Sequence, residues 1–281
     1  MGWLEALVLG LVQGFTEFLP ISSSAHLRIV PELFNWPDRG SAVTAVLQLG
    51  TLVAAFIYFR EDVARMLKAL WIDCKKFRPG STPDGSMVWK IAIGTIPVVV
   101  LGLTLKKQIE NDFRNLYMVA CAIIFFSVVL WFAERYSYQK VKKGVSLREE
   151  RDISFKDAMI IGLFQTLALV PGASRSGVTI TGGLCVGLNR STATRFSFLL
   201  SLPAILGAGI YQLYKERHSL FAESDSTITL LFSLIVSGVI GYLSIAFMLN
   251  YLRKHTTYLF IIYRLILGVA ILILLFQGVL V

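Results

Sequence analysis

A carboxylate, a hydroxyl group and an imidazole lie close together near the start of the chain, in Glu17, Ser23 and His26. Together these groups can serve as a base, a nucleophile and an acid. Gln13 precedes Glu17 by four residues, so on a helix the two side chains share one face. The surrounding sequence is apolar, where polar groups are costly unless they have partners or a function.

Two structural explanations of these residues stay open. Glu17 could be a structural carboxylate whose partners lie elsewhere in the fold. Ser22, Ser23 and Ser24 follow a break at Pro20, so their role could be limited to capping the next helix, without any part in chemistry. We favour chemistry and assign Gln13, Ser22 and Ser24 to substrate binding around the three reactive groups.

A second polar segment runs from Pro171 to Thr179 and reads Pro-Gly-Ala-Ser-Arg-Ser-Gly-Val-Thr. Glycine frees the backbone, serine can cap the next helix, and Arg175 offers a rigid fork of donors beside exposed N–H groups, which suits phosphate oxygens. The structural alternative is that Arg175 pairs with an acid, of which Glu17 is the first candidate. Besides a catalytic Arg175, the predicted phosphate site includes Gly172, Ser174, Ser176 and Thr179.

The two polar segments belong to an internal repeat. Gly10-Leu11-Val12-Gln13 recurs as Gly162-Leu163-Phe164-Gln165 at an offset of 152 residues, whereas Pro20 and Pro171 are offset by 151. One deletion aligns the copies and sets Ser23 opposite Ser174. We therefore divide a single membrane domain, residues 1–281, into repeats 1–150 and 151–281.

Composition identifies the environment of these segments. The chain is 55% hydrophobic and 16% charged, with a mean hydropathy of +0.67, which is typical of an integral membrane protein. Six apolar runs approach or reach the length of about 20 residues that crosses a bilayer. These runs are Val43–Phe59, Met87–Leu105, Leu116–Ala133, Phe196–Tyr214, Ile228–Leu249 and Tyr258–Phe276.

Each half begins with two helical pieces joined by a proline-containing break. The pieces are Met1–Leu19 with Ser22–Phe34, and Phe155–Val170 with Ser174–Gly187. Re-entrant helical hairpins explain both pairs. Three spans follow each hairpin, and because three is odd, the second half must have the opposite orientation. The predicted fold is all-α and polytopic, an inverted repeat whose hairpin tips meet near the membrane midplane.

Basic residues predict the orientation. Loops on one face hold 17 of the 27 lysines and arginines and loops on the other face hold 6, among them Arg39, Lys106, Lys107 and Arg114. The positive-inside rule places the first face in the cytoplasm and both termini outside. It also accounts for the net charge of +9 without a nucleic-acid partner. Arg195 and Arg264 lie inside apolar runs, where they could pair with Glu134 or carbonyl groups or extend to a membrane interface, and we leave both out of the site.

The two motifs resemble the undecaprenyl pyrophosphate phosphatase family, also called the bacitracin-resistance family. Its hallmarks are E/Q-xxx-E with a nearby Ser-Ser-x-x-His, and PG-x-SRS-x-x-T. They match Gln13 to Glu17, Ser22 to His26 and Pro171 to Thr179. The resemblance covers nearly the whole chain. It implies an enzyme of the bacterial inner membrane that hydrolyses undecaprenyl pyrophosphate to the monophosphate, recycling the lipid carrier of cell-wall synthesis.

The resemblance also implies a divalent cation, Mg or Ca, and a site that opens outward. The first motif residue is commonly Glu in the family and is Gln13 here, so Glu17 alone must serve as the carboxylate ligand. The expected partners are a long-chain prenyl pyrophosphate and the bilayer, with a homodimer as a further possibility.

Several alternatives concern the activity. Ser23 could attack the phosphorus as a nucleophile after Glu17 or His26 removes its proton, or Glu17 could activate a water that attacks directly. An inverted repeat with polar groups at the midplane is also typical of secondary transporters, so the chain could carry or flip an anionic prenyl lipid. A structural or assembly protein would not need the polar set.

Overall fold

The computed structural model describes residues 1–37, 40–105, 115–220 and 224–280, and these residues form helices and no strand. The first half contains α1 Trp3–Phe18, α2 Ser23–Leu33, α3 Gly40–Tyr58, α4 Arg60–Lys76, α5 Pro83–Thr104 and α7 Leu116–Lys142. The second half contains short 3-10 helices η2 Glu150–Asp152 and η3 Leu167–Leu169, together with α8 Phe155–Thr166, α9 Arg175–Cys185, α10 Arg190–Leu220, α11 Ser224–Lys254 and α12 Tyr258–Phe276.

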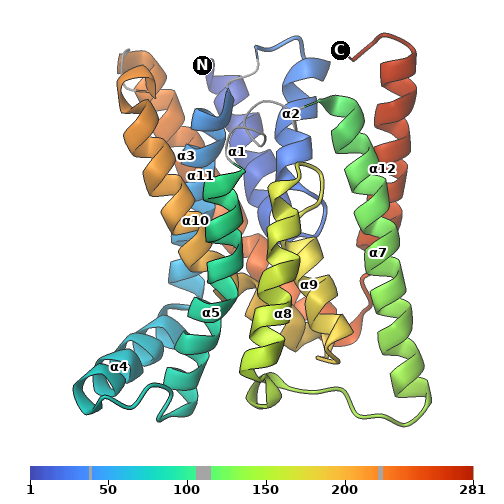
Figure 1. Ribbon diagram of the computed structural model, residues 1–281. Coiled ribbons are helices and arrows are strands. Elements are labelled where there is room, and N and C mark those ends of the chain that lie inside the picture. The colour runs from blue at the N-terminus through green and yellow to red at the C-terminus, as the bar shows by residue number, and fades with distance from the viewer. Residues whose placement is uncertain (38–39, 106–114, 221–223, 281) are drawn as a thin grey trace.

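Two helical hairpins occupy the centre of the molecule. The first consists of α1 and α2, and it begins at the end where both termini lie (Figure 1). The second consists of α8, η3 and α9, and it begins at the opposite end (Figure 1). The Ser176 hydroxyl of the second hairpin donates to the Leu19 carbonyl of the first at 3.0 Å. The predicted meeting of the two tips is therefore confirmed.

The tips show that the predicted alignment of the repeats was wrong by one residue. Ser22 precedes α2 with φ 74° and ψ 92°, and Ser174 precedes α9 with φ 68° and ψ 110°. Such left-handed backbone is uncommon for a residue other than glycine, so the shared geometry marks these two serines as equivalent. The offset is then 152 throughout, without a deletion, and Ser23 is the counterpart of Arg175.

Each hairpin packs against a span of the other half. The limb α1 lies on α11, and the limb α8 lies on α5, while α3 packs against α10 and α7 against α12. This exchange agrees with an inverted repeat, which stays a prediction. The repeated glycine permits the contact, since a Cβ at Gly10 would lie 2.7 Å from the Ser233 carbonyl oxygen, and one at Gly162 would lie 2.2 Å from that of Gly94.

Five helices among the described residues are long and apolar enough to cross a membrane. They are α5, α7, α10, α11 and α12. The predicted first span, α3, turns by 78° into α4 after Tyr58. No apolar run covers residues 60–86, which predicts a loop there, and this prediction is wrong because residues 60–76 form the helix α4. Met66, Ala69 and Asp73 form a buried stripe on α4, and Asp73 accepts hydrogen bonds from Gly80 N and Ser81 Oγ, which closes the following loop.

Both termini lie at the same end of the bundle, as the odd number of spans in each half requires (Figure 1). The loop between α7 and α8 and the helix α4 lie at the other end, where most of the basic residues were predicted (Figure 1). Four basic residues predicted at the end of the termini, Arg39, Lys106, Lys107 and Arg114, lie outside the described residues.

Candidate active site

Glu17 lies at the junction of the two hairpins and is 5% exposed. Its Oε2 accepts hydrogen bonds from Gln13 Nε2 at 2.8 Å and from Ser23 Oγ at 2.7 Å. Its Oε1 accepts from Arg175 Nη2 at 2.7 Å. Four residues predicted from separate motifs are therefore in one cluster. The predicted structural alternative for Glu17 and Arg175, an ion pair, is also present, and it is part of this cluster.

Ser23 is not a helix cap. The N-cap position of α2 belongs to Ser22, whose side chain makes no capping bond, and the Ser23 hydroxyl points to Glu17 instead. A hydroxyl within 2.6–3.2 Å of a base has the separation expected of an activated nucleophile. Because no side chain caps α2, its first N–H groups stay available to an anion. Ser174 differs, since its Oγ caps α9 by accepting from Gly177 N at 3.2 Å.

Two buried polar atoms of the cluster have no partner within the described part of the chain. They are Arg175 Nη1, a donor, and Gln13 Oε1, an acceptor. Buried polar atoms are nearly always hydrogen-bonded in folded proteins, so an unpaired donor and acceptor at one junction indicate a ligand position. The donor suits a phosphate oxygen, and the acceptor suits a cation or a water molecule.

Three predicted substrate-binding residues join the two tips. Gly172 N donates to Ser24 Oγ at 3.3 Å, and Ser176 Oγ donates to the Leu19 carbonyl. Gly172 has φ +93°, and a Cβ there would lie 2.5 Å from the Val119 carbonyl oxygen, so only glycine fits. The polar atoms of Gly172 and Ser176 are thus occupied within the protein, whereas Ser24 remains exposed to a cavity beside the tips.

Arg264 holds the junction together, and sequence reasoning left it out of the site. Its side chain is fully buried, and it donates to the carbonyl oxygens of Pro20 at 3.3 Å, Gly172 at 3.1 Å and Ala173 at 3.0 Å. The expected carbonyl partners are therefore confirmed. These carbonyls come from both tips, so Arg264 fixes one hairpin relative to the other. The signal in the sequence was an arginine inside the apolar run of α12.

His26 faces away from Ser23. Its Nδ1 is 2.8 Å from the Ser22 carbonyl oxygen, which only accepts, so Nδ1 carries a proton. Its Nε2 lies 2.7 Å from the Tyr263 hydroxyl, and the two rings stack with centroids 5.8 Å apart. The geometry thus favours Glu17 over His26 as the base for Ser23. Nothing in the sequence singled out Tyr263.

Thr179 stabilises the part of α9 that carries Arg175. Its Oγ1 donates to the Arg175 carbonyl oxygen at 2.8 Å and contacts the Ser197 hydroxyl, and its side chain is fully buried. It therefore holds the first turn of α9, on which Arg175 lies.

Arg195, the other arginine left out of the site, pairs with Asp62 and Glu150. Glu134 pairs with Arg190 and Thr257.

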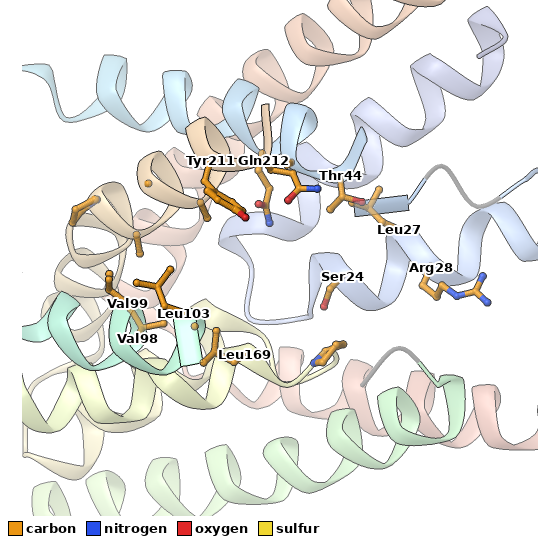
Figure 2. A pocket seen from close by; sticks show the side chains of 18 of the residues that line it. Ser24, Leu27, Arg28, Thr44, Val98, Val99, Leu103, Leu169, Tyr211 and Gln212 are labelled. Atoms are coloured by element: carbon orange, nitrogen blue, oxygen red, sulfur yellow. The ribbon is translucent and has the colours of Figure 1, made fainter. Parts of the chain in front are cut away.

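A cavity of about 610 Å³ borders the junction (Figure 2). Ser24 of α2 and Leu169 of η3 line it next to the tips, and Val98 and Leu103 of α5 lie across from Ser24 (Figure 2). Tyr211 and Gln212 of α10 add polar groups at one side. This volume is within the usual range for small-molecule sites.

The oxygen ligands at the junction are too few to bind a divalent cation without additional ligands from a substrate. The described residues contain no group of three or more His, Cys, Asp or Glu side chains that could hold a metal. Glu17 and Gln13 Oε1 provide one carboxylate and one amide oxygen. Mg²⁺ commonly combines one or two protein ligands with substrate phosphates and waters. These residues therefore fit a cation that arrives with a diphosphate, and do not form a cage for a resident ion.

The fold and the site define a class of protein: a multi-pass membrane protein in which two hairpin tips form a buried site suited to a phosphate group. Comparisons with known proteins name the family. The family model described as Bacitracin resistance protein BacA matches residues 6–270. The chain belongs to this family.

Curated relatives match over the full length. The chain is 50% identical to the undecaprenyl-diphosphatase of Chlorobium limicola over 280 residues, covering 100% of this chain and 99% of the relative. It is 51% identical to that of Chlorobium chlorochromatii over 278 residues, with 99% of each chain covered. It is 52% identical to that of Chloroherpeton thalassium over 278 residues, covering 99% of this chain and 98% of the relative.

Proposed function

We propose that the protein hydrolyses undecaprenyl diphosphate to undecaprenyl phosphate and inorganic phosphate, which recycles the lipid carrier of cell-wall synthesis. The observation that carries the proposal is the Glu17 carboxylate, bound on one oxygen by the Ser23 hydroxyl and on the other by Arg175. This arrangement combines a nucleophile, a base and a phosphate ligand. The names of the curated relatives support the same activity.

The first step is attack on the terminal phosphorus. Glu17 accepts the proton of Ser23, the Ser23 oxygen bonds to phosphorus, and the bond to the bridging oxygen breaks. Undecaprenyl phosphate leaves and takes the proton from Glu17, which restores the carboxylate. Water then attacks the phosphoserine, Glu17 accepts the proton of the water and passes it to the Ser23 oxygen as the bond between that oxygen and phosphorus breaks, and inorganic phosphate is released. Direct attack by water activated by Glu17 is the competing route.

Charge stabilisation is the main demand of phosphoryl transfer. Arg175 Nη1, which is buried and unpaired in the described chain, would bind a non-bridging oxygen. The uncapped N-terminus of α2 would bind another through N–H groups that carry partial positive charge. His26 acts as a positioning residue in this scheme, because its Nδ1–H holds the Ser22 carbonyl at the strained tip.

A divalent cation, Mg or Ca, is part of the proposal. Glu17 and Gln13 would hold it together with the substrate, and when bound it would neutralise charge on the diphosphate. Gln13 keeps the oxygen ligand that a glutamate would supply but lacks its charge. The cation would therefore be held mainly by the substrate.

Charge and topology support a location and an orientation in the membrane. The basic loops would lie in the cytoplasm and both termini outside, in the bacterial inner membrane. The first hairpin and the cavity would then open toward the outer face. A homodimer is compatible with this arrangement, because the site is built from one chain.

A phosphate-release assay on purified protein tests the activity. We expect undecaprenyl diphosphate in detergent or in vesicles to yield one inorganic phosphate per molecule, and we expect the Glu17→Gln variant to be inactive. If labelled lipid crosses the vesicle membrane without phosphate release, the protein is a carrier and the proposal fails.

A further inference from the structure

The cavity beside the hairpin junction has a polar end and an apolar body. At the polar end, Ser24 reaches from the tip of the first hairpin, and its Oγ accepts the hydrogen bond of Gly172 N from the second. Helix α5 contributes Val98, Val99 and Leu103 to the body of the cavity (Figure 2). Gly207 of α10 is also part of its lining. The cavity therefore borders the site, and its wall combines these aliphatic groups with the polar side chains of Thr44, Gln48, Tyr211 and Gln212.

Its walls leave room for a branched chain. A Cβ built on Gly207 meets no atom within 4 Å, so this stretch of α10 borders open space. Val99 is 46% exposed and Leu103 is 70% exposed, although both lie on the face of α5 that lines the cavity. Helices α5 and α10 are both membrane-span candidates, so a chain that extends beyond the cavity at this depth meets lipid rather than water.

The volume sets a limit on the occupant. At the packing density of protein interiors, about 0.75, a cavity of 610 Å³ accepts roughly 450 Å³ of van der Waals volume, and an isoprene unit fills roughly 90 Å³. About five isoprene units therefore fit, on the same packing estimate. An undecaprenyl chain has eleven, so more than half of it must lie elsewhere.

We propose that the cavity binds the isoprene units nearest the diphosphate, about five of them by this packing estimate, and that the remaining units lie outside the cavity in the bilayer. This inference rests on the proposed function. It makes the protein selective for the proximal part of a polyprenyl chain and indifferent to the distal part.

The physical consequence is a limit to chain-length dependence. Moving a prenyl unit from lipid into an apolar cavity gains little hydrophobic free energy, because lipid tails are as apolar as the cavity wall. The gain comes from close packing and from orienting the diphosphate at Ser23. Units within the cavity contribute to both effects, and units in the bilayer contribute to neither.

The test compares prenyl diphosphates of two, three, four, five and eleven units at equal mole fraction in vesicles. We expect kcat/KM to rise about tenfold from two units to five, which corresponds to about 1.4 kcal/mol, and then to change by less than about twofold up to eleven. A steady rise up to eleven units would overturn the inference. Absence of phosphate release from every substrate would instead refute the proposed function.

Two neighbouring valines of α5 provide a matched pair of variants. Val99 lines the cavity, whereas Val100 is 52% exposed and does not line it. We expect Val99→Trp to lower the ratio of kcat/KM for five units over two units about tenfold, since an indole would occupy the cavity. Val100→Trp should leave this ratio unchanged. Equal ratios in the two variants would contradict the inference.

Photo-crosslinking gives a measurement that does not depend on turnover. A photoreactive group on the third isoprene unit should label α5 or α10 around Val99 and Gly207. The same group on the last unit of an eleven-unit chain should label lipid. Labelling of the cavity from the last unit, or its absence from the third, would overturn the inference.

Discussion

Ser23 and Arg175 occupy the same position in the two hairpins and bind opposite oxygens of one carboxylate. Each is the first residue of its helix, after a serine with positive φ. Ser23 Oγ reaches Glu17 Oε2 and Arg175 Nη2 reaches Glu17 Oε1, both at 2.7 Å. One copy of the repeat thus supplies a hydroxyl group where the other supplies a guanidinium group.

Replacement of Arg175 by alanine is expected to lower kcat/KM at least about a hundredfold, the usual effect of losing one preorganised donor to a developing charge. Arg175→Lys should restore only part of the rate, because lysine keeps the charge and loses the planar fork. Kinetics in detergent, with thermal melting to verify folding, are the measurement. Arg60→Ala, on the exposed side chain of α4, is the control, and an unimpaired Arg175→Ala would refute the phosphate role.

Ser23→Ala distinguishes the two routes of attack. If Ser23 is the nucleophile, the variant loses turnover, and acid quenching of the wild-type enzyme during a single turnover traps phosphoserine at residue 23. If water attacks directly, no phosphoserine forms. Because one oxygen from water enters the phosphate by either route, the trapped phosphoserine decides between them. Ser233→Ala on α11 serves as the control, because the Ser233 hydroxyl donates only to the Leu230 carbonyl oxygen of its own helix among the contacts of the described residues.

Gln13→Glu should increase the affinity of the site for a divalent cation. The unpaired Gln13 Oε1 would become a charged carboxylate oxygen beside Glu17, and hard cations prefer charged oxygen ligands. We expect a lower concentration of Mg²⁺ or Ca²⁺ for half-maximal phosphate release after chelation and re-addition. Gln13→Leu removes the oxygen and should have the opposite effect. Insensitivity of the wild-type enzyme to chelators would exclude the proposed cation.

Tyr263→Phe tests whether His26 positions the first tip. The variant keeps the stacked ring and removes the hydroxyl that bonds His26 Nε2. A lost hydrogen bond of about 0.5–1.5 kcal/mol corresponds to a decrease in kcat/KM of up to about tenfold. We expect the decrease in kcat with little change in KM. The matched control is Tyr242→Phe on α11, and an equal effect of both variants would contradict the role.

Arg264→Leu should reduce stability as well as activity. Arg264 donates to carbonyls of both tips from a fully buried position. Each hydrogen bond to a charged group is worth about 1.5–3 kcal/mol, so we expect a loss of at least about that size in the free energy of unfolding. Denaturation in mixed micelles measures the loss. A stable Arg264→Leu variant with wild-type activity would show that the junction does not need this arginine.

The sequence by itself determined the class of fold and most of the site. Apolar runs of membrane-span length predicted α5, α7, α10, α11 and α12, and the repeated polar breaks predicted the two hairpins. Glu17, Ser23 and Arg175 were identified because polar residue types are costly inside apolar sequence. These features are local, and composition and spacing therefore reveal them.

Only the tertiary structure decided which partners these residues have. It assigned Ser23 to Glu17 and His26 to Tyr263, and it showed that Arg264 joins the tips from α12. It also corrected the repeat alignment. The correction depends on the positive φ of Ser22 and Ser174, and the residue type serine does not predict this backbone conformation. Hydrogen bonds between helices far apart in the chain depend on how the helices pack, and the spacing of residues along the chain does not predict that packing.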